Sequence, residues 1–124
     1  MRHFILLALI GFAFGISPIA TAQTDNPALD AKFKAIEGLS RAKNLARQAA
    51  ETANGGLEQY RAELRMHGNS AQSPYVDRDD MWVFTFAGGA PGSDSLTIET
   101  EVQVAKADFQ TTVVYNGAVR STSP

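Results

Sequence analysis

The sequence predicts an α+β fold, with an N-terminal helix packed on one face of a four-stranded antiparallel meander sheet. Three observations predict it. Residues 40–53 carry apolar side chains at helical spacing, four later stretches alternate apolar with polar side chains, and turn-forming residues separate those stretches. Strands with one polar face are typical of an antiparallel sheet that is covered on one side only. Consecutive strands with short links pair most simply as a meander, with the helix across one face.

The first 22 residues have the pattern of a secretory signal peptide. Arg2 and His3 form a short positive region, residues 4–16 are an apolar run, and residues 20–22 form an A-x-A cleavage site. The pattern predicts a mature chain that starts at Gln23 and is periplasmic or secreted. A membrane span needs about 20 apolar residues, and this run is shorter. Because the chain has no cysteine for lipid attachment, no stable membrane anchor is expected after cleavage.

Composition excludes several classes of site. The chain has 124 residues, enough for one domain, and its formal net charge of −2 gives no electrostatic footprint for nucleic acid. It has no cysteine, which excludes disulfides, cysteine metal sites and a cysteine nucleophile. His67 is the one histidine after the cleavage site, so a zinc site with several histidines is also excluded. We therefore expect a protein that is not an enzyme and has no cofactor.

Residues 23–38 form a lead-in to the main helix. Asn26 and Pro27 make a good helix start, because asparagine can cap the first turn and proline fits within it. We expect a short helix that Gly38 breaks or kinks before Ser40. The alternative is one continuous helix to Asn54, because the apolar positions hold their register across Gly38.

The main helix is expected to begin at Ser40, whose hydroxyl can accept a hydrogen bond from the first turn. Its apolar stripe consists mostly of alanine, so the helix backbone can lie close to the layer that it covers. Gly55 and Gly56 follow Asn54 and are expected to end the helix, since glycine tolerates the left-handed backbone of a C-terminal cap.

Four stretches with a period of two are expected to be strands: residues 60–66, 81–87, 96–105 and 109–115. The links between them are expected to be an exposed loop (67–80), a hairpin connection (88–95) and a short turn (106–108). Asn116 and Gly117 are expected to end the fourth strand, which leaves residues 118–124 as a disordered tail. The predicted core beneath the alanines comprises Tyr60, Leu64, Met66, Trp82, Phe84, Phe86, Leu96, Ile98, Val102 and Val104.

The order of helix, glycine stop and alternating strand resembles the PepSY-type domain over residues 39–117. The residues that carry this resemblance are Ser40, Ala42, Ala46, Ala49, Gly55, Gly56 and the alternating stretch 60–66. PepSY domains are exported or membrane-attached and are associated with binding or inhibiting peptidases. The resemblance therefore implies a cystatin-like arrangement of a helix wrapped by an antiparallel sheet, and an unknown protein partner in the exported compartment, such as a peptidase.

Candidate site residues are few. Asp77, Asp79 and Asp80 could supply oxygen ligands to a cation, but they lack the glycine and the distal glutamate of an EF-hand, so a solvated acidic turn is favoured and no metal site is predicted. Tyr75 lies in the same loop and is a further binding candidate. His67 is near serines, but no nucleophile-elbow motif surrounds them, so no catalytic residue is predicted.

The outward sheet face carries a second set of candidates. Arg61 and Arg65 share the outer face of the first strand, and Glu99 and Glu101 share that of the third strand. These charges could form a binding surface, although a solvated sheet face normally carries such residues.

Two function hypotheses follow. The first is a non-enzymatic exported binding module that offers a loop or a sheet edge to a protein partner. The alternative is a small-ligand or enzymatic domain, which needs a cavity beneath the helix lined by Tyr60, Trp82 and Thr100. A closed core with an edge strand open to solvent would favour the first.

Overall fold

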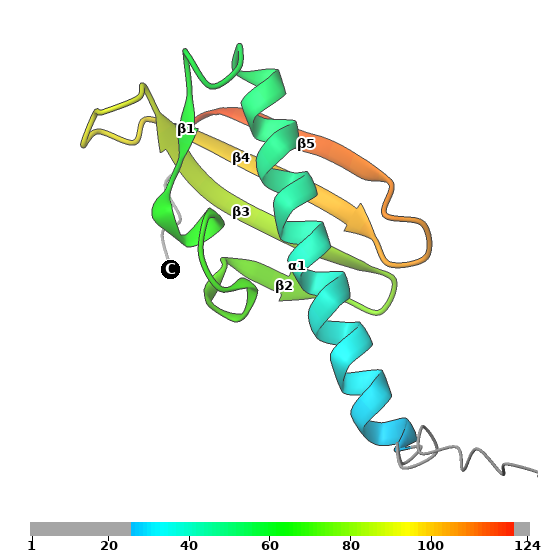
Figure 1. The fold of residues 1–124 in the computed structure, drawn as a ribbon. Coiled ribbons are helices and arrows are strands. Elements are labelled where there is room, and N and C mark those ends of the chain that lie inside the picture. Colours follow the sequence, from blue (N-terminus) through cyan, green and yellow to red (C-terminus); the bar gives the residue numbers. More distant parts are fainter. Residues whose placement is uncertain (1–25, 121–124) are drawn as a thin grey trace, which may run out of the picture.

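A computed structural model describes residues 26–120 of the chain. One long helix lies across one face of an open five-stranded antiparallel sheet (Figure 1). This confirms the predicted α+β fold with a helix on an antiparallel sheet, although the sheet has one more strand than expected. The predictions for the signal peptide (1–22), for the start of the lead-in (23–25) and for the last four residues (121–124) lie outside the described residues.

The helix, α1 (Pro27–Ala53), is continuous. The side chain of Asn26 caps it by accepting a hydrogen bond from the Leu29 N–H at 3.1 Å. The predicted break at Gly38 is therefore wrong, and the alternative of one continuous helix is confirmed. The glycine serves packing instead, because a Cβ built at Gly38 would lie 3.2 Å from the ring of Trp82. Gly55, with φ at 95°, follows the helix end at Asn54 as predicted.

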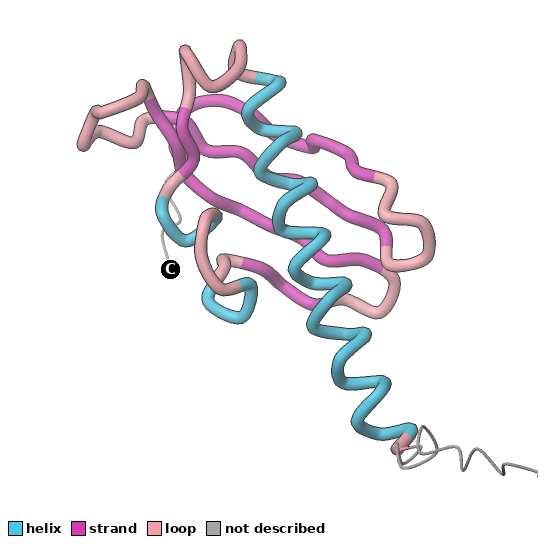
Figure 2. The backbone as a smooth tube through the Cα atoms, viewed as in Figure 1, coloured by secondary structure: helices cyan, strands magenta, loops and turns pink. Residues whose placement is uncertain are grey.

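The strands are β1 (Arg61–Ala62), β2 (Tyr75–Asp77), β3 (Met81–Gly89), β4 (Ile98–Ala105) and β5 (Thr111–Ala118). Strands β2 to β5 form a meander of neighbouring antiparallel pairs (Figure 2). Strand β1 also pairs with β3, so β1 and β2 share one edge of β3 at its two ends. The sheet therefore has one edge that is split between two short strands, and one edge formed by β5 alone.

The core lies between the alanine stripe of α1 and the aromatic face of β3. Ala42, Ala46 and Ala50 have no exposed surface, and Phe84 opposite them is equally enclosed. The small alanine side chains let the helix backbone approach the sheet, while the large side chains come from the strands. The core is Ala42, Ala46, Ala50, Tyr60, Ala62, Met66, Trp82, Phe84, Phe86, Val102 and Val104. Eight of the ten predicted core residues are confirmed, counting Ile98, which packs against this cluster while partly buried.

The predicted first strand is mostly wrong. Only Arg61 and Ala62 pair with β3, and a 3-10 helix (Leu64–Met66) follows. The cause is Glu63, whose N–H donates to the Ala87 carbonyl while its carboxylate accepts from the Ala87 N–H at 2.7 Å. The Glu63 carboxylate thus accepts the hydrogen bond that a strand carbonyl would otherwise accept, and the backbone leaves the sheet after Ala62. Leu64, a predicted core residue, is consequently 86% exposed.

The link before β3 is not the open loop that was predicted. It contains a 3-10 helix (Ser70–Gln72) and the short strand β2. On the other side of β3, the predicted third strand begins two residues late, at Ile98. Leu96 therefore stays in the hairpin connection and is 41% exposed, so its predicted place in the core is also wrong.

Strand β5 continues past its predicted end. Asn116 and Gly117 lie inside the strand, which runs to Ala118. Asn116 is held there because its side-chain oxygen accepts from the Thr100 hydroxyl at 2.7 Å and from the Asn54 amide at 3.0 Å. These bonds tie the sheet to the end of the helix. Among residues 26–120, no helix combines the length and the apolar content that crossing a membrane requires.

Candidate functional site

A groove of about 460 Å³ opens between the N-terminal half of α1 and the strands β2 and β3. Its apolar lining includes Ile36, Leu39, Tyr75 and Trp82, and its polar lining consists of Lys32, Asp77 and Lys106. A mostly apolar hollow with a few charged groups at its rim is the usual composition of a binding site.

The groove exists because α1 is longer than the sheet is wide. Its 27 residues span about 40 Å at 1.5 Å per residue, and its fully buried alanines all lie in the C-terminal half. The N-terminal half projects beyond β2 (Figure 1). There Leu29, Phe33 and Ile36 form an apolar stripe with helical spacing, and they are 47%, 56% and 55% exposed. We call this stripe, together with the groove, the overhang surface.

Trp82 forms a rigid part of the groove wall. Its ring stacks on that of Phe109 with the centroids 6.0 Å apart, and the Lys106 ammonium lies 5.4 Å from the ring centroid. Gly38 of α1 lies beside the edge of the indole, because a Cβ built there would be 3.2 Å from the ring. Only 7% of Trp82 is exposed. A side chain packed this tightly on several sides offers a preformed surface, which lowers the ordering cost of binding.

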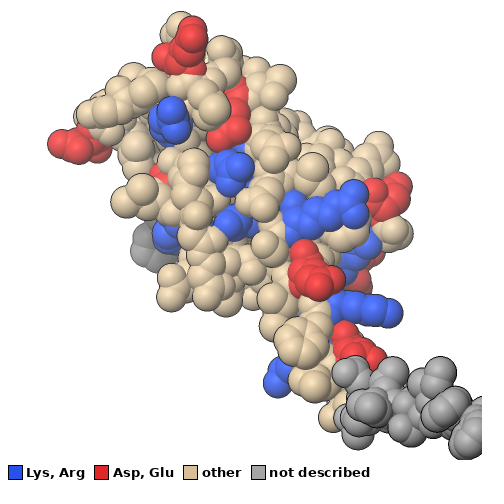
Figure 3. All heavy atoms as spheres, in the orientation of Figure 1, with Lys and Arg blue, Asp and Glu red and all other residues tan. Residues whose placement is uncertain are grey.

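The charges at the rim are unequal. Lys106 forms an ion pair with Asp77, whereas Lys32 makes no ion pair within residues 26–120. On the molecular surface, basic side chains gather along α1 with acidic ones between them (Figure 3). The rim of the groove therefore has an excess of positive charge, which favours a ligand group that carries a carboxylate.

Two of the six predicted binding residues, Tyr75 and Asp77, lie at this groove. Asp79 and Asp80 are exposed between β2 and β3, and in the part of the chain that is described no cluster of acidic or histidine side chains could hold a metal ion. The structure does not bring Asp79 and Asp80 into the groove.

Arg61 and Arg65 lie elsewhere. Arg61 lines a hollow beside Leu64, at the end of the sheet where β1 pairs with β3. Arg65 forms an ion pair with Glu63 at 2.5 Å. Neither Arg61 nor Arg65 lines the groove, so the predicted arginine surface is separate from it.

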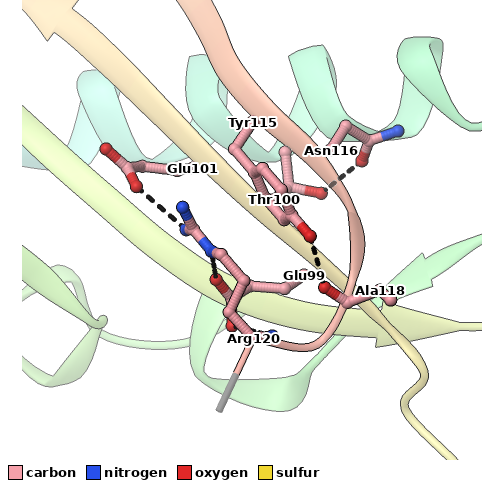
Figure 4. Close-up of polar contacts among 7 residues, drawn as sticks. All are labelled: Glu99, Thr100, Glu101, Tyr115, Asn116, Ala118 and Arg120. Atoms are coloured by element: carbon pink, nitrogen blue, oxygen red, sulfur yellow. Dashed lines mark hydrogen bonds and ion pairs between the residues drawn. The ribbon is translucent and has the colours of Figure 1, made fainter. Parts of the chain in front are cut away.

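The charges predicted on the open sheet face are largely neutralised. Arg120 reaches back across that face, where its guanidinium pairs with Glu99 and, at 2.9 Å, with Glu101 (Figure 4). It also lies 3.8 Å from the ring centroid of Tyr115. The predicted tail is thus anchored as far as Arg120, and Glu99 is buried rather than solvated.

The core beneath the helix is closed. The alternative function requires a cavity lined by Tyr60, Trp82 and Thr100. Tyr60 and Thr100 have no exposed surface, and only Trp82 borders a hollow. The Tyr60 hydroxyl forms no hydrogen bond of normal geometry within residues 26–120. Burial raises the pKa of this phenol, and the neighbouring Thr100 side chain offsets part of that rise.

Sequence reasoning missed most of the groove. Trp82 is predicted for the core, which is confirmed, but not for a groove wall. Lys32 and Ile36 are predicted for the lead-in, as a short helix or as part of one continuous helix, with no binding role. The sequence did contain a signal for the groove. Leu29, Phe33 and Ile36 continue the apolar register of the helix, but they precede the alanines that pack on the sheet, so they form a stripe with no predicted partner.

Comparison with known proteins adds no relative: no family model, no curated protein and no solved structure matches the chain. The resemblance to PepSY-type domains therefore stays a prediction.

Proposed function

We propose that the protein is a non-enzymatic binding module of the exported compartment, and that its overhang surface receives a segment of a partner protein. The observation that carries this proposal is the apolar groove beside the projecting half of α1. The groove provides a preformed aromatic wall at Trp82. The stripe Leu29, Phe33 and Ile36 extends the same apolar surface outward, and exposed apolar patches of this kind commonly mark interaction sites.

The chemistry of the rim describes the partner segment. Apolar side chains of the segment would pack on Ile36 and Trp82, and an acidic side chain would approach Lys32. Strand β2 borders the groove and lies at the sheet edge, so an extended segment could also form backbone hydrogen bonds there. The resemblance to PepSY-type domains supports a peptidase as the partner, with inhibition as the effect.

The polar residues of the described chain support a role without catalysis. His67 is exposed, while Ser73 is buried and its hydroxyl donates to the Ser70 carbonyl at 2.6 Å. This serine is therefore used in the loop structure and not poised beside a base. Glu99 and Glu101 are both held by Arg120.

The test is a binding measurement with residues 23–124. Trp82 is the single tryptophan, so its fluorescence reports on the groove directly. A displayed library of random peptides is selected on the protein, and the selected peptides are then titrated. Selected peptides should be apolar with an acidic residue, and binding should change the Trp82 emission.

Ile36→Asp should weaken the binding about tenfold or more, because it places a charge in the apolar lining. Leu64→Asp is the matched control, since Leu64 is 86% exposed at the other end of the sheet. Equal binding by both variants would overturn the proposal. For the peptidase, capture from the exported fraction followed by mass spectrometry should recover a peptidase with the native protein and lose it with Ile36→Asp.

A further inference from the structure

Strand β5 forms a whole edge of the sheet. Its eight residues, Thr111–Ala118, pair with β4 on one side, and no strand within residues 26–120 pairs with the other side. In Figure 1 it lies at the sheet margin opposite β1 and β2. The Ala105 N–H donates to the Gln110 carbonyl at 2.9 Å. Because antiparallel hydrogen bonds alternate along a strand, the backbone groups of Thr111 and Val113 then point away from β4.

The composition of β5 does not protect this edge. No charged residue occurs between Asp108 and Arg120, and the first half of the strand is Thr-Thr-Val-Val. Val113 and Val114 are 38% and 44% exposed. Natural sheets usually protect an edge with lysine, with proline, with a β-bulge or by keeping the edge strand short. Strand β5 has a bulge at Val114, between the pairs Val102–Val113 and Glu101–Tyr115, but Thr111–Val113 form a regular edge before it. The opposite edge follows that rule, because β1 and β2 are short and Pro74 precedes β2.

We propose that a second copy of this chain pairs with β5 in the antiparallel sense, so that two sheets become one continuous sheet. The charge pattern favours a second copy. The chain carries a net negative charge, but two β5 strands meet without like-charge repulsion because neither is charged. A two-fold contact of this kind closes on itself and gives a dimer.

The dimer is independent of the overhang surface. The groove lies beside β2, on the sheet edge opposite β5, so pairing through β5 leaves both grooves open to a partner. The two proposals can therefore fail separately.

Sedimentation of residues 23–124 over a range of concentrations provides the first test. We expect a dimer whose dissociation constant rises about tenfold or more in Thr112→Lys/Val114→Lys, because lysines on facing edges repel. The matched control is Thr85→Lys/Gln103→Lys, which adds the same charge on the interior strands β3 and β4 and should leave the dimer intact. Circular dichroism verifies that each variant folds.

Cysteine cross-linking provides the second test, because the native chain has no cysteine to interfere. Val114 lies near the middle of β5, so Val114→Cys should give a disulfide-linked dimer under mild oxidation. Leu64→Cys, which is even more accessible but lies near the opposite edge, should not. The proposal is overturned by a monomer at every concentration, by a dimer that tolerates the β5 lysines, or by equal cross-linking at both cysteines.

Discussion

Tyr60 is the largest fully buried side chain, and its hydroxyl is the one buried side-chain polar atom without a partner among the described residues. A buried polar group without a well-formed hydrogen bond loses its hydration and regains little, and here the neighbouring Thr100 compensates only in part. Tyr60→Phe should therefore raise the free energy of unfolding by about 1 kcal/mol, measured by denaturant titration at pH 7. Tyr115→Phe is the control, because the Tyr115 hydroxyl donates to the Ala118 carbonyl at 2.6 Å, and its loss should lower stability.

The same residue predicts a dependence on pH. Burial raises the pKa of Tyr60 above 10.0, so the folded protein retains the phenol proton after the unfolded chain has released it. The stability that the neutral phenol contributes is present below pH 10 and is lost as the pH rises through the raised pKa. The advantage of Tyr60→Phe should consequently grow above pH 10. A constant difference between the two proteins from pH 7 to the alkaline range would contradict the raised pKa.

Gly88 depends on the same tyrosine. A Cβ built at Gly88 would lie 2.3 Å from the Tyr60 hydroxyl oxygen and 2.4 Å from ring carbons, so either the strand or the ring must move. Gly88→Ala should lower the free energy of unfolding by about 2 kcal/mol, the usual cost of overpacking a core. Gly68→Ala is the control, because nothing lies within 4 Å of its Cβ position. Equal effects of the two alanines in thermal or chemical unfolding would refute the close packing.

At the scale of the elements, Glu63 decides where β1 ends. Glu63→Ala leaves the Ala87 N–H without its side-chain acceptor, and this should cost about 2 kcal/mol. Glu63→Gln keeps an acceptor oxygen and should cost less. Hydrogen exchange at the Ala87 amide provides the direct measurement. It should be fastest in the alanine variant, and unchanged exchange in that variant would show that the carboxylate does not protect the strand.

The elements show which patterns the sequence encodes locally. Residues 81–87 and 98–105 were predicted well, because their alternation reports directly on a sheet with one covered face. Residues 60–66 alternate as clearly, but there the Glu63 carboxylate takes the place of a strand carbonyl as the acceptor for the Ala87 N–H. The period of a sequence cannot reveal such a hydrogen bond between residues 24 positions apart. The short strand β2 was missed because turn-forming residues surround it. The groove was missed because its walls come from four separate elements and the turn after β4.

At the scale of the whole molecule, export is one of the sequence expectations that remain to be tested. Residues 1–22 should be removed, so the exported protein should begin at Gln23 by N-terminal sequencing or intact mass. Ala20→Lys/Ala22→Lys should accumulate the full-length precursor, because the cleavage site requires small residues. A native protein that retains its first residues in the exported fraction would contradict the prediction. The double variant serves as the reference for the uncleaved mass.

The length of α1 also has a thermodynamic consequence. Its first turns rest on no sheet, so they can unwind while the remainder of the fold stays intact, as helix ends without tertiary support generally do. A ligand that needs those turns wound must supply the ordering free energy from its own contacts. Affinity would then depend on helix propensity at solvent-facing sites that never touch the ligand. Evolution could strengthen or weaken the interaction there while leaving the recognition chemistry unchanged.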